Sequence, residues 1–293
     1  MNSQKCNCGK PAVYLRLNEG RHYCGLCLTR QIERNFTKTI AKENMVKKGD
    51  SIAVGVSGGK DSMVLLHLMN KLRKKVPIKI FAITIDEGIK GYRNKSLAVV
   101  ADLTKEMEIE HHVFSFKDEI GASLDELKES KFCTKCGVFR RYMLNKKSRE
   151  LGATKLAVGH NLDDEAQSVL MNVMRGDVGR IKRKNGSNKF VPRIKPLKNI
   201  PEKELVAYAI INNIPYFEGE CPYSFDNMRR DVQTIINEME AKHPGTKNQI
   251  VKFGQKVRFV KEPQNIKDCS KCGEPSSQEV CKACQLREEV KKS

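Results

Sequence analysis

Gly55-Val56-Ser57-Gly58-Gly59-Lys60-Asp61-Ser62 is the stretch that decides the fold of this chain, because it lies between a β-rich run and an apolar helix pattern. Its paired glycines let the backbone approach a phosphate closely, and the first amides of the following helix are unpaired donors at a partly positive end. Lys60 adds a positive charge, and Ser57 and Ser62 add hydroxyl groups. The stretch therefore predicts a phosphate-binding loop; the alternative is a simple Gly-rich turn. It is not a Walker A motif, which has Gly and Ser or Thr where Val54 and Asp61 stand here.

The segments around this loop alternate between strand and helix patterns. Strands are expected at 51–56, 78–85, 109–116 and 154–158, and helices at 61–75, 94–107, 137–151 and 163–175. Such alternation predicts βαβ units and a parallel sheet, whose ligand lies outside the carboxyl ends of the strands. Polar or Gly residues follow three of these strands, from Ser57, Asp86 and Gly159 onward. Further helices are expected at 31–48, 201–213 and 227–242, and a Pro- and Lys-rich connection after them.

Length and composition exclude several classes of protein. A chain of 293 residues corresponds to about two domains. With 39% hydrophobic and 30% charged residues, it is not a largely disordered chain. No apolar run approaches the roughly 20 residues that span a bilayer, and the start lacks the apolar segment of a signal peptide. These features predict a cytoplasmic protein with no membrane partner.

The charge balance points to a polyanionic partner. Lys and Arg number 54 and Asp and Glu 35, a net charge of +19. Basic runs lie at 71–79, 180–198, 229–230 and 252–261. Aromatic residues are only 6% and Trp is absent, so an extended base-stacking platform is not expected. Recognition of a folded RNA by its backbone and shape fits this composition better.

The 11 cysteines form groups of four, three and four along the chain. An odd number without a sign of secretion argues against disulfides. The last group, Cys269-x2-Cys272-x8-Cys281-x2-Cys284, has the paired spacing of a tetrahedral zinc site, and Gly273 eases the turn. The first group, Cys6-x-Cys8-x15-Cys24-x2-Cys27, predicts a second zinc site. Its first pair is shorter than usual, so His22 could replace one thiolate.

The middle group consists of Cys133, Cys136 and Cys221. Three thiolates suit an iron–sulfur cluster with one open iron. The same residues could instead be a redox pair with one structural thiol, or small buried apolar side chains. Spacing alone leaves these three interpretations open.

The SGGKDS stretch resembles the PP-loop of the adenine nucleotide α-hydrolase-like ATP pyrophosphatases, over roughly residues 50–225. That resemblance implies an α/β parallel-sheet domain in which the loop grips the β- and γ-phosphates of ATP. The ATP-binding residues that it implies are Gly55, Val56, Ser57, Gly58, Gly59, Lys60, Asp61, Ser62, Ile85, Arg140, Gly159 and Asp164. Alone it leaves GMP synthesis, lysidine synthesis and tRNA thiolation open.

The combination of motifs is more specific. A PP-loop, a CxxC pair followed by Arg-Arg, the run 159–167 (GHNLDDEAQ) and a later single Cys resemble the tRNA 2-thiolation enzymes. Zinc modules at both ends are similar to the 2-thiouridine subgroup, which includes archaeal and thermophile enzymes and the eukaryotic cytoplasmic wobble-uridine thiolation proteins. The domains expected on this basis are an N-terminal zinc module (1–30), the PP-loop domain (31–225), a helical basic segment (226–262) and a C-terminal zinc module (263–293).

The resemblance also implies roles for single residues. Cys133, Cys136 and Cys221 would hold a [4Fe–4S] cluster whose fourth iron is free to carry sulfur. The catalytic basic residue of the family, often Lys, falls on Arg140, which keeps the charge but does not transfer a proton. The acidic partner falls on Asp164, with Asp163 beside it as the alternative. His160 is expected only as a packing residue.

The implied reaction has two steps. The C2 oxygen of a tRNA uridine attacks the α-phosphate of ATP, while Mg²⁺, Lys60 and Arg140 stabilise the developing charge and pyrophosphate leaves. Sulfur on the open iron then displaces AMP. The implied cofactors are ATP, Mg²⁺, one [4Fe–4S] cluster and two Zn²⁺; the implied partners are tRNA, a sulfur donor (sulfide, a ubiquitin-like carrier protein or a desulfurase product) and a second copy of the chain.

Three other interpretations stay open at this point. The chain could thiolate a cytidine, or it could be a zinc-dependent RNA-binding protein with a vestigial ATP loop. Cys133 and Cys136 could also carry sulfur as a persulfide without any cluster.

Overall fold

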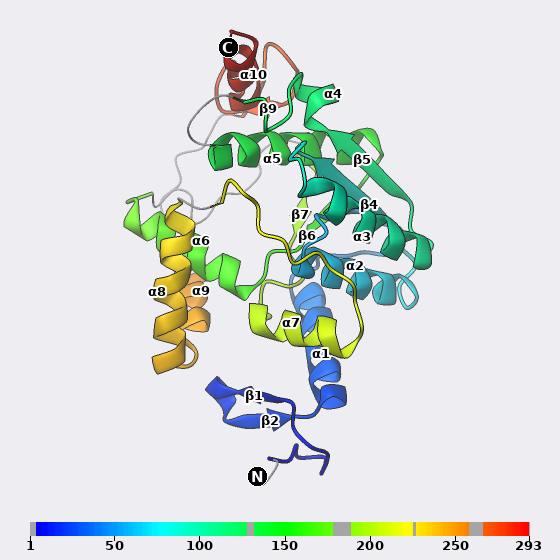
Figure 1. Ribbon diagram of the computed structural model, residues 1–293, viewed down its shortest axis with the longest axis vertical. Coiled ribbons are helices and arrows are strands. Elements are labelled where there is room, and N and C mark those ends of the chain that lie inside the picture. Colours follow the sequence, from blue (N-terminus) through cyan, green and yellow to red (C-terminus); the bar gives the residue numbers. More distant parts are fainter. Residues whose placement is uncertain (1–3, 128–131, 178–188, 225–226, 258–265, 293) are drawn as a thin grey trace.

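The computed structural model describes residues 4–127, 132–177, 189–224, 227–257 and 266–292 (Figure 1). Its centre is a five-stranded sheet in which all paired strands are parallel, in the order β5-β4-β3-β6-β7. The strands are β3 (Ser51–Gly55), β4 (Lys79–Asp86), β5 (His111–Ser115), β6 (Lys155–Val158) and β7 (Arg193–Ile194). The expected α/β parallel-sheet class is confirmed.

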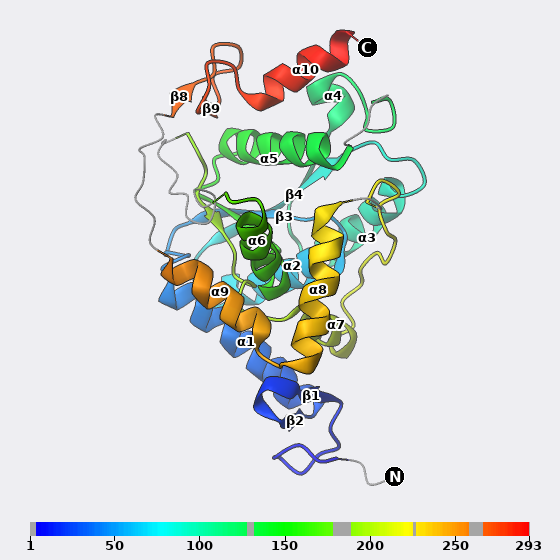
Figure 2. The same cartoon turned by 90° about the vertical axis from the view of Figure 1, so that its left-hand side faces the viewer.

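The sheet is covered on both faces, because neighbouring residues of its strands point to opposite sides. Ile80 and Ala82 of β4 face one apolar core, whereas Phe81 and Ile83 face another. Figure 2 shows α5 on one side of the sheet and α1, α2 and α7 on the other. The first core also takes side chains of α3, and the second those of α4 and α10. These helices are α1 (Gly25–Lys42), α2 (Lys60–Arg73), α3 (Arg93–Glu106), α4 (Phe116–Ile120), α5 (Phe132–Glu150), α7 (Glu202–Ile211) and α10 (Lys282–Lys292).

The register places β3 at the centre of the sheet. Val54 lies between Ala82 of β4 and Ala157 of β6. The loop that follows β3 therefore emerges at the middle of the carboxyl edge, between the ends of β4 and β6. This is the position that a ligand takes in an open parallel sheet.

Three helices form a smaller core beside the sheet: α6 (Leu162–Met174), α8 (Met228–Lys242) and α9 (Thr246–Lys256). A buried ion pair joins Lys247 of α9 to Asp163 of α6, and the second oxygen of Asp163 accepts a hydrogen bond from the Glu202 amide at 2.9 Å. Asp163 thus points into the protein, and its neighbour Asp164 is the carboxylate left for the sheet edge. The ion pair between Lys247 and Asp163 fixes the amino end of α6.

The two cysteine modules dock at opposite ends of the molecule (Figure 1). The N-terminal hairpin of β1 (Tyr14–Arg16), η1 (Leu17–Glu19) and β2 (Arg21–Tyr23) is tied to α7 by a buried Arg16–Glu204 pair at 2.7 Å. The C-terminal module holds β8 (Lys267–Asp268) and β9 (Pro275–Ser276). Its buried Glu274 accepts hydrogen bonds from Asn145 at 3.1 Å and Arg149 at 3.0 Å, both on α5.

Several expected elements differ from those found. Helix α5 begins at Phe132 and not at Gly137, so the CxxC pair lies in its first turns and not before it. Helix α1 begins at Gly25, earlier than the expected 31, and α9 is an additional helix within the expected helical basic segment. The two-residue strand β7 was not expected, because it lies in a basic run without strand periodicity.

The other expected helices and strands end within a few residues of the observed ones. Parts of the basic runs 180–198 and 252–261 lie outside the described residues. No helix in the described ranges is both long enough and apolar enough to cross a membrane.

Candidate active site

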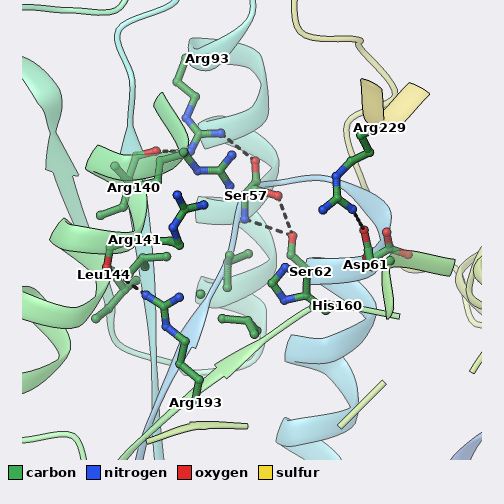
Figure 3. A pocket seen from close by; sticks show the side chains of 18 residues that line it. Ser57, Asp61, Ser62, Arg93, Arg140, Arg141, Leu144, His160, Arg193 and Arg229 are labelled. Carbon is green, nitrogen blue, oxygen red and sulfur yellow. Dashed lines mark hydrogen bonds and ion pairs between the residues drawn. The ribbon is translucent and has the colours of Figure 1, made fainter. Parts of the chain in front are cut away.

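A pocket of about 440 Å³ opens at the carboxyl edge of the sheet (Figure 3). It contains nearly all the residues expected to bind ATP: Gly55, Val56, Ser57, Asp61, Ser62, Ile85, Arg140, Gly159 and Asp164. Gly58, Gly59 and Lys60 do not line it. The other lining residues are Ile83, Arg93, Gly137, Arg141, Leu144, Val158, His160, Arg193 and Arg229.

The PP-loop is held in shape by its own serines. The Ser62 hydroxyl donates to the Gly59 carbonyl at 2.8 Å and accepts from the Ser57 amide at 3.1 Å. Gly58 has a φ of +87°, and a Cβ there would lie 2.7 Å from the Ser96 carbonyl oxygen. The loop therefore requires glycine at this position, both for its backbone conformation and for its approach to α3. Its shape is set before any ligand arrives.

The loop after β6 packs tightly against the start of α2. A Cβ on Gly159 would lie 3.1 Å from the Ser62 amide nitrogen. Beyond it, the Asn161 side chain caps α6 by accepting a hydrogen bond from the Asp164 amide at 3.0 Å. The Asp164 carboxylate in turn accepts a hydrogen bond from the Asn161 amide at 3.2 Å. This capping box fixes the Asp164 carboxylate at the pocket.

Two carboxylates lie at the pocket near the PP-loop. Burial raises the pKa of Asp61 to about 7. The positive charge of Lys60 opposes this rise, and the negative charges of Glu202 and Asp164 add to it. Burial also raises the pKa of Asp164, which pairs with Arg229 of α8 at 3.3 Å. Carboxylate oxygens are the donors that Mg²⁺ prefers, so this pair fits a divalent cation held beside a triphosphate.

Lys60 is the first residue of α2 and is held by carboxylates. Its ammonium group lies 2.5 Å from Glu202 and 3.5 Å from Asp61. Burial would lower the pKa of Lys60, but these two carboxylates raise it above its usual value. The ammonium group is therefore charged, and it sits beside the pocket and not in its wall.

One buried carboxylate, Glu87, ties the site to α5. Its two oxygens pair with Arg140 at 3.2 Å and with Arg93 at 3.0 Å, and it is only 4% exposed. Arg93 also donates to the carbonyl oxygens of Ser57, at 2.9 Å, and Ile85. Burial would lower the pKa of Arg140, but the carboxylate of Glu87 raises it above its usual value. The Arg140 guanidinium is thus a fixed positive charge at the pocket.

Sequence reasoning missed Glu87 and all the pocket arginines except Arg140. The sequence holds only weak indications of these residues. Glu87 follows the end of an expected strand, and Arg141 follows Arg140. Arg229 belongs to a basic pair that by itself indicates only an RNA-binding surface. Figure 3 shows Arg93, Arg140, Arg141 and Arg193 on one side of the pocket and Arg229 on the other. Such a set of cations is suited to phosphate groups.

The middle cysteines gather at the amino end of α5. Cys136 and Cys221 pack against the same apolar core, and the Cys133 thiol donates to the Tyr223 carbonyl at 3.0 Å. Burial raises the pKa of Cys136 to about 12 and also raises that of Cys221, and a negative charge on Cys133 would add to both rises. The three sulfurs are not all within 4.8 Å of one another. A [4Fe–4S] cluster binds each thiolate through a different iron and so spaces sulfurs more widely than one ion does, which fits this arrangement.

The terminal cysteines form compact groups. In each group of four, all sulfurs lie within 4.8 Å of one another: Cys6, Cys8, Cys24 and Cys27, and Cys269, Cys272, Cys281 and Cys284. His22 is not part of the first group. Four thiolates this close suit one tetrahedral ion.

Comparisons with known proteins find relatives of this chain along nearly its whole length. Residues 28–238 match the PP-loop domain family. The tRNA 2-thiolation protein NcsA of Haloferax volcanii is 34% identical over 97% of this chain and 98% of its own length. The cytoplasmic tRNA 2-thiolation protein 1 of Caenorhabditis elegans is 37% identical over 96% of this chain and 79% of its own. The solved structure of the U34-tRNA thiolase NcsA from Methanococcus maripaludis, with its [4Fe–4S] cluster, superposes with a TM-score of 0.87 at 37% identity, covering 99% of this chain and 97% of that one.

The raised pKa of Asp61 makes stability depend on pH in the absence of nucleotide and Mg²⁺. The folded chain keeps its proton up to about pH 7, whereas the ordinary value is 3.8, so this contribution to stability is complete below about pH 4 and is lost as the pH rises through 7. Asp61→Asn removes that loss. Between pH 4 and pH 8, we expect the free energy of unfolding of the variant to rise relative to that of the wild type by about 2 kcal/mol. This is about half of the full effect of the shift, since the side chain is 24% exposed.

Urea unfolding at pH 4, 6 and 8 measures this difference. Asp102→Asn, at an exposed carboxylate of α3, is the matched control and should leave the pH dependence of the wild type unchanged. An Asp61→Asn variant that follows the wild type across this range would show that the carboxylate is ionised in the folded chain.

Proposed function

The chain belongs to the PP-loop family of tRNA 2-thiolation proteins, and from this premise we propose that it is an ATP-dependent tRNA uridine 2-sulfurtransferase. One observation carries the proposal: helix α5 carries the CxxC pair in its first turns and Arg140, which lines the ATP pocket, directly after them. Arg140 lies one helical turn after Cys136, so both occupy the same face of α5. An adenylating site and a sulfur-bearing site therefore share one helix end.

In the first step the pocket activates the uridine. The triphosphate binds at the PP-loop, where Lys60 exchanges its contact with Glu202 for phosphate oxygens. Asp61 and Asp164 are the carboxylates that would hold Mg²⁺. The C2 oxygen of the uridine attacks the α-phosphate, Arg140 stabilises the negative charge that develops there, and pyrophosphate leaves. Arg140 needs no proton transfer for this role, because it acts as a fixed charge.

In the second step sulfur replaces the adenylated oxygen and AMP leaves. Cys133, Cys136 and Cys221 are the residues that would hold the [4Fe–4S] cluster, which supplies an open iron for the incoming sulfur. The protein's own contribution is placement. Cys136 is on the same helix face as Arg140, and Cys136 and Cys221 pack, partly buried, against the same apolar core.

The terminal modules would each bind one Zn²⁺ through their four cysteines, as the compact geometry of both groups supports. We assign 1–30 and 263–293 to these modules, 31–225 to the PP-loop domain and 226–262 to a helical basic segment. Sulfide or a ubiquitin-like carrier protein would deliver the sulfur, and a second copy of the chain is the expected partner. The names of relatives such as the Caenorhabditis elegans protein support a cytoplasmic location.

Nucleoside mass spectrometry tests the proposed reaction. Unmodified tRNA is incubated anaerobically with iron-reconstituted protein, ATP, Mg²⁺ and sulfide. We expect 2-thiouridine from the wild type and none from Cys221→Ala, because the variant lacks one of the three thiolates. Pyrophosphate release separates the two steps. Cys221→Ala should still release pyrophosphate, because its adenylation pocket keeps all its lining residues.

The other products have distinct meanings. Formation of 2-thiocytidine would assign the chain to cytidine thiolation. Binding of tRNA without AMP or thiolated product would favour the RNA-binding interpretation, in which the ATP loop is vestigial.

Metal analysis of the anaerobically purified chain tests the metal assignment. We expect two zinc and up to four iron atoms per chain. Cys284→Ser should lower zinc without lowering iron, whereas Cys136→Ser should do the reverse, because the two residues belong to different cysteine groups. An active preparation with zinc but no iron would contradict the cluster and support a persulfide on Cys133 and Cys136.

A further inference from the structure

A second pocket of about 290 Å³ lies beside the ATP pocket, between α5 and the C-terminal module. Arg141 of α5 and Arg193 of β7 line both pockets, so the two cavities meet at these side chains. The two residues lie next to each other in Figure 3. The adenylation and sulfur steps described above make no use of this second cavity.

The two arginines are held together in spite of their like charges. The Arg193 guanidinium donates to the Arg141 carbonyl at 3.0 Å. Burial and the charge of Arg141 lower the pKa of Arg193 to about 10. Within the described ranges, no carboxylate forms an ion pair with Arg193. The two guanidinium groups therefore lie side by side where the cavities meet, and their planar donors suit the oxygens of one phosphate group.

Gly137 lies one turn before Arg141 in α5. A Cβ on Gly137 would lie 3.3 Å from Nη1 of Arg141. The absent side chain leaves room for the guanidinium to lie along the helix, at the junction of the two pockets.

The walls of the second pocket are suited to a flat ring. Tyr142 and Phe190 supply aromatic surface, and Lys282 adds a positive charge. The polar groups at its base satisfy each other: Asn145 donates to Glu274 at 3.1 Å and accepts from the Val191 amide at 3.0 Å. What remains for a ligand is aromatic surface next to cations, the combination that binds a base and its phosphate.

We propose that this pocket binds a nucleotide of the tRNA adjacent to the target uridine, with its phosphodiester on Arg141 and Arg193 and its base against Phe190. The inference rests on the proposed function, because it places the target uridine in the neighbouring ATP pocket. The carboxyl tail of a sulfur-carrier protein is the less suitable occupant, since an extended peptide would leave the aromatic surface unused. The net charge of +19 also favours RNA.

Binding of unmodified tRNA at several salt concentrations, without ATP, tests the site. For Arg193→Gln we expect weaker binding and a slope of log K against log salt that is smaller by about 1, because one phosphate contact is lost. For Phe190→Ala we expect about tenfold weaker binding with the slope unchanged, since stacking carries no charge. Arg193→Lys should restore the slope, and Phe190→Tyr the affinity. Arg34→Gln, at an exposed residue of α1, is the charge-matched control.

The outcomes separate this site from the proposed function. Wild-type affinity and slope in both Arg193→Gln and Phe190→Ala, with native zinc content, would overturn the nucleotide site alone. Variants that bind tRNA normally but lose thiolation only when a carrier protein supplies the sulfur would overturn it in favour of the peptide tail. Failure of the wild type to bind tRNA would overturn the proposed function and this site with it.

Discussion

The active site depends on one buried carboxylate, that of Glu87. It emerges at the end of β4 and pairs with Arg93 of α3 and Arg140 of α5. A buried carboxylate is costly unless it is paired, and two guanidinium groups converging on a pocket are costly unless a carboxylate lies between them. Each charge therefore requires the others. The result is that α5, which carries the CxxC pair, cannot shift along the sheet without breaking the contact that holds Arg140 at the ATP pocket.

The two cysteine modules contact the helices that surround the ATP pocket. The C-terminal module is joined to it through Glu274, Asn145 and Arg149, and the same module forms one wall of the second pocket. The N-terminal module is joined instead to α7, whose first residue, Glu202, contacts Lys60. The two cysteine modules thus brace the two sides of the ATP pocket from opposite ends of the chain. This gives a structural reason for two terminal cysteine modules in a chain whose chemistry lies elsewhere.

The sequence predicted those parts of the fold and site that rest on local pattern. The loop 55–62 combines its glycines, serines and lysine within eight positions, and the strands around it have clear apolar runs. Glu87 was missed because a carboxylate after a strand is usually exposed, and its burial depends on pairing with Arg93 and the distant Arg140. The choice between Asp163 and Asp164 depends on Lys247, 84 positions away, on a helix whose bounds the sequence did not indicate. Arg193 lies on a two-residue strand that has no periodicity to detect.

The most direct test of the account is the rate of pyrophosphate release in the presence of tRNA by Glu87→Gln. The amide keeps the shape of the side chain but leaves Arg93 and Arg140 without a negative partner. The account predicts that kcat falls about 100-fold while KM for ATP changes little, because Arg140 moves from the α-phosphate and the PP-loop stays intact. Glu87→Asp should recover part of the rate, and Glu110→Gln, at an exposed carboxylate before β5, should match the wild type. A wild-type kcat in Glu87→Gln would contradict the central role given to this carboxylate.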